Sequence, residues 1–207
     1  KRAEPEFYGY TQTGPGLMEA IADRLQRKFN WHIEPEWVTL TPGVIPAISV
    51  AIKALTHPGD EIILQEPVYY PFFGCVKSTG CQVATNQLKF IDGRYEMDFA
   101  DLESKFQPKK GMHDGASRAK AVLLCNPHNP IGRLWGREDL MKLGDIVIGH
   151  GATVISDEIH CELLFKGYKH TPFASLSKEF EQNCIVCMAP SKTFNLAGLS
   201  ASSIIIP

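Results

Sequence analysis

The stretch Ala121-Val122-Leu123-Leu124-Cys125 is a continuous apolar run that ends in the loop Asn126-Pro127-His128-Asn129-Pro130. An amphipathic segment over residues 137–150 follows, and a second apolar run, Ala152 to Ser156, comes after it. Short continuous apolar runs separated by amphipathic helices are typical of parallel strands that are buried on both faces. This order predicts an α/β fold, a three-layer α/β/α sandwich with a mainly parallel sheet.

The same alternation extends over the whole chain. The hydrophobic pattern predicts further strands over residues 37–40, 61–65, 82–85, 185–188 and 203–206, and further helices over residues 17–29, 44–55, 69–77 and 98–106. The chain has 207 residues, of which 44% are hydrophobic and 21% charged, as is ordinary for a globular protein. We therefore interpret residues 1–207 as one domain. Because the chain opens at Lys1 without Met and stops directly after the apolar run 204–206, we expect it to be a piece of a longer protein.

Charge and hydropathy exclude two classes of partner. The net charge is −2 and no basic block is present, which argues against nucleic acid. No apolar run approaches the roughly 18 residues that a membrane span requires. The six cysteines mostly lie in or beside apolar runs, and residues three apart in a strand, such as Cys184 and Cys187, face opposite sides. We therefore expect free thiols and a cytoplasmic protein. The histidine spacings match no metal-ligand pattern, so we expect no metal site.

Polar residues follow several of the predicted strands at the point where each strand ends. In an open parallel sheet, ligands bind beyond these carboxyl ends. Asn129 follows one strand, Asp157 follows the next, and Ser191 with Lys192 follows a third. The helix that begins at Val44 and Ile45, after the first strand, offers free backbone N–H groups that suit a phosphate.

Each of these residues, taken alone, also has an ordinary structural explanation. Lys192 fits a surface lysine, Asp157 fits a helix cap, and Asn129 fits a turn between two prolines. Tyr69 fits the core, and His160 fits a satisfied polar residue. Their placement at one sheet edge favours a shared function over separate accidents. A lysine for a Schiff base, a carboxylate for a pyridinium nitrogen and a phosphate cradle are what pyridoxal 5'-phosphate requires of a protein.

Three motifs, in this order, resemble a known family: Asn-Pro-His-Asn-Pro-Ile-Gly from residue 126, Ser-Asp-Glu-Ile-His from residue 156, and Ala-Pro-Ser-Lys-Thr-Phe-Asn from residue 189. They are similar to those of fold-type I pyridoxal-phosphate enzymes of aminotransferase class I/II. Within that family, His160 and the segment Lys169 to Leu176 resemble the MalY/PatB-type cystathionine β-lyases. The resemblance covers essentially the entire chain.

The resemblance implies a role for each candidate residue. Lys192 would form the Schiff base with the cofactor and then move the proton at the substrate α-carbon. Asp157 would pair with the pyridinium nitrogen, Asn129 and His160 would contact the phenolic oxygen side, and Tyr69 would stack on the ring.

Further residues match the phosphate site and the subunit contact of the family. The backbone at Val44 and Ile45, together with Ser191, would hold the phosphate. Tyr10 matches a position that reaches the neighbouring subunit's site in family homodimers. Ser200 departs from the family, because many aminotransferases carry an arginine for the phosphate at that position. The small C-terminal domain and the N-terminal segment of the family have no counterpart here, so the chain would be the large domain.

The function implied first is C–S β-lyase activity on cystathionine or related sulfur amino acids, by α,β-elimination to pyruvate, ammonia and a thiol. The alternative is an aminotransferase, which exchanges the amino group between an amino acid and a 2-oxo acid. A noncatalytic domain that keeps the fold is a third hypothesis, and the set of Lys192, Asp157 and Asn129 argues against it.

Overall fold

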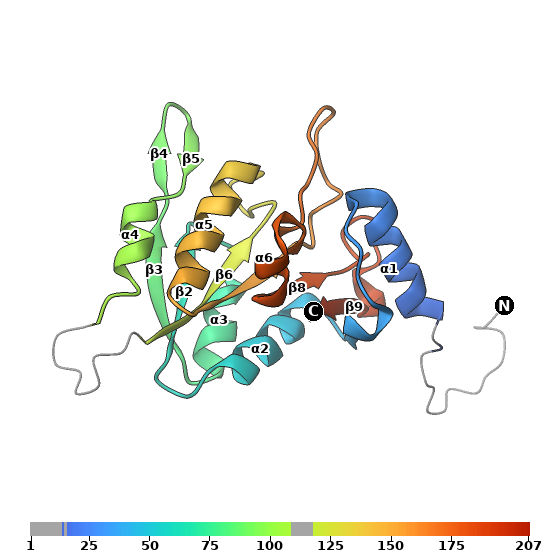
Figure 1. Ribbon diagram of the computed structural model, residues 1–207, viewed down its shortest axis with the longest axis horizontal. Helices are drawn as coiled ribbons and strands as arrows, with labels where there is room; N and C mark the ends of the chain where they lie inside the picture. Colours follow the sequence, from blue (N-terminus) through green and yellow to red (C-terminus); the bar gives the residue numbers. More distant parts are fainter. Residues whose placement is uncertain (1–13, 15, 109–117) are drawn as a thin grey trace.

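A computed structural model describes residue 14 and residues 16–108 and 118–207. Its centre is a seven-stranded sheet in the order β1-β9-β8-β7-β6-β2-β3 (Figure 1). The strands are β1 (Val38–Thr41), β2 (Glu61–Glu66), β3 (Gln82–Gln87), β6 (Ala119–Cys125), β7 (Thr153–Asp157), β8 (Cys184–Met188) and β9 (Ser202–Ile205). The predicted strands are all present, with boundaries shifted by a few residues at most.

The sheet is mainly parallel, as predicted. β3, β2, β6, β7 and β8 pair in parallel, whereas β9 is antiparallel to both β8 and β1. Two reversals restore the direction, so β1 runs the same way as β8. The carboxyl ends of β1, β6, β7 and β8 therefore lie along one edge of the sheet, where the sequence places the candidate site residues.

Helices cover both faces of the sheet and complete three layers. They are α1 (Gly16–Phe29), α2 (Val44–Leu55), α3 (Pro71–Ser78), α4 (Phe99–Ser104), α5 (Arg137–Gly149) and α6 (Lys178–Gln182), with 3₁₀ turns η1 (Pro35–Trp37), η2 (Phe173–Leu176) and η3 (Ala197–Leu199). α2 and α3 pack on one face, and α1, α4, α5 and α6 pack on the other (Figure 1). Successive strand residues alternate between these two cores, so Ile62 packs with α2 while Ile63 packs on the other side.

The cysteines behave as expected. All six are free and buried. Cys184 belongs to one core and Cys187 to the other, so the sheet itself separates the two thiols of the C-x-x-C spacing. Within the described ranges, no helix combines the length and apolar character that crossing a bilayer requires.

The local structure differs from the sequence-based prediction in several places. A hairpin of β4 (Lys89–Ile91) and β5 (Arg94–Glu96) was not predicted, although Asp92-Gly93 at its turn is a recognised hairpin signal. The helix expected from Tyr69 begins only at Pro71, which suits a first helical position. Leu17, at the start of the predicted amphipathic helix over 17–29, is 46% exposed, whereas Met18 beside it packs against the core. Residues 109–117, between the predicted helix over 98–106 and the next strand, lie outside the described residues.

Gly144 in α5 provides a test of the packing between α5 and α6. A Cβ atom at this position would overlap the ring of Phe180. We expect Gly144→Ala to lower the free energy of unfolding by about 1–3 kcal/mol, despite the higher helix propensity of alanine. Urea denaturation measures the change. Gly149→Ala at the end of the same helix is the control, because a Cβ there meets nothing within 4 Å. Equal stability of the two variants would contradict this packing.

Candidate functional site

An open cavity of about 190 Å³ lies at the carboxyl-end edge of the sheet. Its walls come from the start of α2, the residues before α3, the loop after β6, the turn after β7 and the segment after β8. The lining residues are Pro42, Gly43, Val44, Ile45, Tyr69, Cys125, Asn129, Asp157, Ile159, His160, Ser191, Lys192, Ala197, Ser200 and Ala201.

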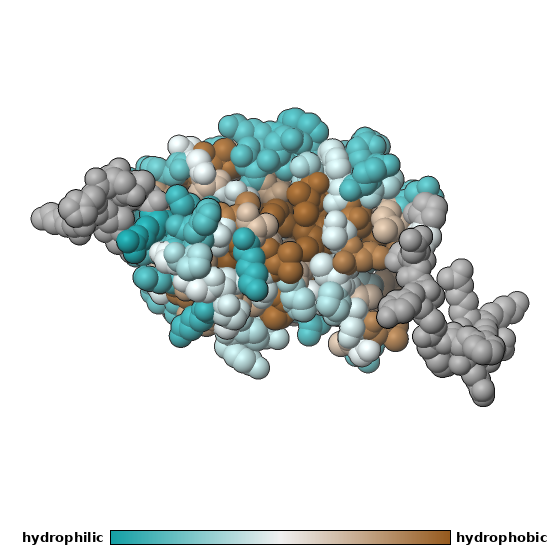
Figure 2. Space-filling view, turned by 90° about the horizontal axis from the view of Figure 1, so that it is seen from below, coloured by the Kyte–Doolittle hydropathy of each residue, from teal (hydrophilic) through white to brown (hydrophobic). Residues whose placement is uncertain are grey.

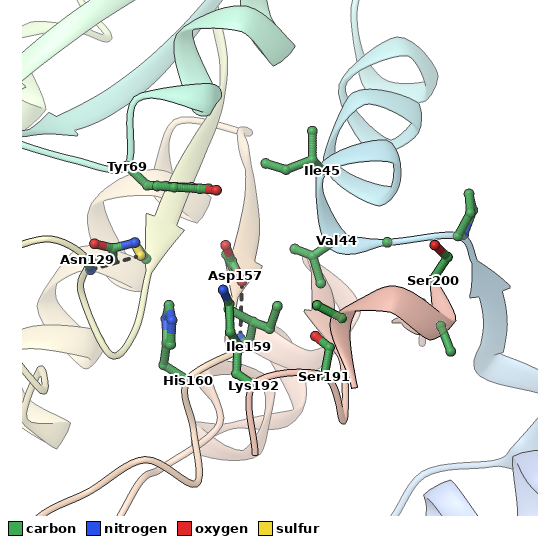
Figure 3. Close-up of a pocket in the computed structure, with 15 residues that line it drawn as sticks. Val44, Ile45, Tyr69, Asn129, Asp157, Ile159, His160, Ser191, Lys192 and Ser200 are labelled. Atoms are coloured by element: carbon green, nitrogen blue, oxygen red, sulfur yellow. Dashed lines mark hydrogen bonds between the residues drawn. The ribbon is translucent and has the colours of Figure 1, made fainter. Parts of the chain in front are cut away.

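The structure brings the candidate residues together in this one cavity. Every candidate that lies in the described part of the chain lines it: Val44, Ile45, Tyr69, Asn129, Asp157, His160, Ser191 and Lys192 (Figure 3). Tyr10 lies outside the described residues. The convergence follows from the sheet topology, because the chain segments involved are distant in sequence.

Asp157 is the last residue of β7 and is 5% exposed. In the described chain its carboxyl group has one hydrogen bond, in which the Ile159 backbone N–H donates to Oδ1 over 3.1 Å. Burial raises the pKa of Asp157 to about 7, and the negative charge of Glu158 adds to this effect. The Ile159 N–H and the charge of Lys192 act in the opposite direction. Because one N–H donor compensates only partly for the lost hydration, this buried carboxyl group is suited to bind a cationic ligand atom.

Lys192 lies in the turn that follows β8, and its side chain is exposed at the mouth of the cavity. Figure 3 shows its amine directed toward Asp157, between that residue and His160. Burial, and then the positive charge of Lys192, lowers the pKa of His160. His160 is therefore neutral at pH 7, so its imidazole can donate one hydrogen bond and accept another.

The start of α2 forms an anion-binding wall. The first hydrogen bond within the helix runs from the Ala47 N–H to the Gly43 carbonyl oxygen over 3.0 Å. The N–H groups of Val44 and Ile45 precede that bond and remain available, and the helix dipole favours negative charge there. Ser191 and Ser200 lie at the same end of the cavity (Figure 3).

A histidine holds the Asn129 loop against the segment that carries Tyr69. The His128 side chain is 1% exposed, and its Nε2 lies 2.9 Å from the carbonyl oxygen of Pro67. Its backbone N–H donates to the carbonyl oxygen of Arg133 over 2.7 Å and closes the loop. The Asn129 N–H donates to Cys125 Sγ over 3.4 Å. These contacts fix Asn129 and Tyr69 on the same side of the cavity.

Cys125 and Ile159 are among the lining residues that the sequence interpretation missed. Cys125 stands directly opposite Asp157 in the β6–β7 register. Burial raises the pKa of its thiol well above the usual value, so the thiol stays protonated and acts as a small apolar wall. Ile159 follows Asp157 by two positions and provides the N–H that the aspartate accepts. The sequence offered a signal for both residues, because Cys125 ends a predicted strand and Ile159 closely follows the candidate Asp157.

The raised pKa of Asp157 predicts a pH-dependent loss of stability in the cofactor-free protein. Between pH 4 and pH 7 the folded state keeps a proton on Asp157 that the unfolded state releases, so the free energy of unfolding falls as pH rises through this range. In Asp157→Asn, the side chain at this position cannot ionise. We expect this variant to match the wild type at pH 4 and to be more stable at pH 8, by on the order of 3 kcal/mol.

Urea denaturation of both proteins at each pH measures this difference. Asp145→Asn, at an exposed position of α5, is the matched control and should follow the wild type at both pH values. Parallel pH profiles of the wild type and Asp157→Asn would contradict a raised pKa.

Comparisons with known proteins show what this chain is similar to. The chain is 46% identical to cystathionine beta-lyase PatB of Bacillus subtilis over 207 residues, which is 100% of this chain and 51% of that protein. A PLP-bound putative aminotransferase from Clostridium difficile has a TM-score of 0.92 at 46% identity, over 100% of this chain and 51% of that chain. Cystalysin from Treponema denticola, which contains a pyridoxal 5'-phosphate cofactor, has a TM-score of 0.89 at 38% identity, over 96% of this chain and 48% of that chain.

The chain thus spans about half the length of the relatives it matches. The family model for aminotransferase class I and II matches residues 3–206, nearly the whole chain. This match agrees with the three motifs and with the observed α/β/α layers, and it confirms the family indicated by the sequence. The chain belongs to the aminotransferase class I and II family.

Proposed function

We propose that residues 1–207 are the cofactor-binding large domain of a PLP-dependent C–S β-lyase. The substrates would be cystathionine or related sulfur amino acids, cleaved by α,β-elimination to pyruvate, ammonia and a thiol. The observation that carries the proposal is the convergence of the Lys192 amine, the Asp157 carboxyl group and the α2 N-terminus on one cavity. The 46% identity to a cystathionine beta-lyase supports the reaction type. The domain assignment is supported by the share of the relatives that the chain spans.

The cavity fits pyridoxal phosphate at both ends and along one face. Asp157 offers a buried carboxyl group to the ring nitrogen, and a positive partner there would offset the effect of burial that raises its pKa. The N–H groups of Val44 and Ile45, with the Ser191 hydroxyl, suit the phosphate. Tyr69 offers a ring that could stack on the cofactor; its own position is fixed by edge contact with Phe72 at 5.9 Å between ring centroids.

When bound, pyridoxal phosphate supplies an aldehyde for an amine and a ring that accepts the electron pair of the substrate α-carbon. Lys192 is the amine that would bind the cofactor and then take the proton from the α-carbon. Asp157 would keep the ring nitrogen protonated. Asn129 and neutral His160 would provide hydrogen bonds on the phenolic oxygen side.

A homodimer belongs to the proposal, because the resemblance places Tyr10 in the neighbouring subunit's site. One face of the molecule supports it. Figure 2 shows hydrophobic residues gathered near the middle of the face at the bottom of Figure 1, where α2 and α3 lie. On these elements Val50 is 56% exposed and Tyr70, just before α3, is 80% exposed. We also propose a cytoplasmic location, which the six buried free thiols support.

The alternative, an aminotransferase, is favoured by the description of the family itself. Both reactions require the same cofactor, the same lysine and removal of the same α-proton. They differ in whether the leaving group on the β-carbon departs or the proton is returned to the cofactor. Turnover with and without a 2-oxo acid acceptor distinguishes the two reactions.

We expect pyridoxal phosphate to be attached at Lys192. Borohydride reduction of the loaded protein, followed by peptide mapping, should place the label on the peptide that contains Lys192. Lys192→Arg keeps the positive charge and should abolish labelling, whereas Lys166→Arg, in an exposed loop, should not change it. Label on another lysine would overturn the assignment.

We expect the protein, together with the sequence that completes the family's small domain, to release pyruvate and thiol from cystathionine without an added 2-oxo acid. Pyruvate is measured with a coupled dehydrogenase and thiol with a chromogenic disulfide. Turnover that strictly requires a 2-oxo acid acceptor would support the aminotransferase alternative instead. Lys192→Arg is the inactive control, and the expected loss is at least about 10³-fold because the proton-transfer group is removed.

A further inference from the structure

Directly after Asp157 lies a buried pair of side chains, Glu158 and His170, that does not line the cavity. Both side chains are 0% exposed, and Glu158 Oε2 lies 2.7 Å from His170 Nε2. Glu158 Oε1 accepts two further hydrogen bonds, from Ser156 Oγ over 3.0 Å and from the Phe173 N–H over 2.9 Å. A fully buried carboxylate requires such partners, and here three donors satisfy it.

The backbone of Glu158 is fixed as firmly as its side chain. Its N–H donates to the carbonyl oxygen of Cys187 in β8 over 2.9 Å, and its own carbonyl oxygen accepts the N–H of Cys161 over 3.0 Å. Glu158 is therefore the anchored residue within the turn that presents Asp157 on one side and His160 on the other. Asp157 faces the cavity, and the Glu158 side chain extends into the opposite core, beside η2.

His170 connects this anchor to two distant parts of the fold. It is the buried residue at which the exposed loop 163–169 returns to the body of the protein. Its ring packs edge-on against Phe29 of α1, with 5.5 Å between centroids. Nδ1 has no partner in the described chain, so the neutral form with its proton on Nε2 leaves no buried N–H unpaired.

We propose that Glu158 and His170 are positioning residues for the cofactor site, which hold the Asp157–His160 turn in the geometry that binds pyridoxal phosphate. The proposal rests on the proposed cofactor and deepens it. His170 fixes the Glu158 carboxylate, Glu158 fixes the turn, and the turn sets the distance between the ring-nitrogen partner and the phenolic-oxygen partner. Loss of either side chain should disturb the site although neither one lines it.

The test uses four variants of the complete protein. Glu158→Gln and His170→Leu remove the pair, and His170→Gln retains an N–H donor near the place of Nε2. Glu181→Gln is the matched control: Glu181 is 6% exposed and likewise accepts a ring N–H, from Trp31 Nε1 over 3.1 Å, but it does not belong to the cavity or to the turn after β7. Two readouts are measured, the affinity for pyridoxal phosphate by absorbance titration and the amide hydrogen exchange of the peptide 157–162 in the cofactor-free protein.

We expect Glu158→Gln and His170→Leu to weaken cofactor binding by about tenfold or more and to speed exchange in the peptide 157–162. His170→Gln should restore most of both properties, and Glu181→Gln should alter neither, even where it lowers the melting temperature.

Wild-type affinity and exchange in Glu158→Gln and His170→Leu would overturn the inference and leave the proposed function intact. If those two variants do not fold, Glu158→Asp replaces them, because it keeps the charge but withdraws the carboxylate from His170 by one methylene. The same weakening and faster exchange are expected of it, and wild-type values would again overturn the inference. A wild-type protein that does not bind pyridoxal phosphate would overturn the proposed function first, and this inference with it.

Discussion

Strand pairing on both sides holds the Asp157 carboxyl group in a buried position. Asp157 pairs with Cys125 of β6 and with Cys187 of β8, so it cannot move outward without breaking two ladders. The flanking thiols are buried and protonated and supply no positive charge. Burial of this carboxyl group therefore lowers the free energy of unfolding unless a cation in the cavity compensates for its lost hydration. A ligand that places a positively charged nitrogen beside Asp157 would recover this free energy when it binds.

The direction of a single strand brings the phosphate wall to the same edge as Asp157. β9 runs against its two neighbours, and this reversal makes β1 end where β6, β7 and β8 end. The α2 N-terminus directly follows β1, so its free N–H groups reach the cavity. A ligand with a cationic ring nitrogen and an anionic phosphate meets opposite local charge at its two ends, which fixes its orientation as well as its affinity.

The sequence predicted this arrangement where the signal was local. The continuous apolar runs predicted the strands, and the helix predicted from residue 98 is present as α4, where the Asp98 side chain accepts a hydrogen bond from the Asp101 N–H. The features that could not be predicted depend on contacts between residues that are distant in the sequence. Leu17 carries the helical pattern but lacks a covering neighbour in the described chain, and the role of His170 depends on Glu158, twelve residues earlier and across a loop. In the sequence pattern Asp157 and Glu158 are equivalent, because both are acidic residues at the end of a strand. The alternation of a strand sends one into the cavity and the other into the core.

The described lining of the cavity contains no arginine, so in the proposed site the phosphate would be bound by backbone groups. Ser200 occupies the position expected for the guanidinium, and its φ of 48° places it in the left-handed region. That conformation costs roughly 1–2 kcal/mol for a residue other than glycine. A charged side chain can reach a ligand from many backbone positions. The N–H groups at the start of a helix reach it only when the helix itself is correctly placed. In the proposed site, phosphate binding would therefore depend on how rigidly α2, Ser191 and Ser200 are held, so cofactor affinity would reflect the packing between α2 and the sheet.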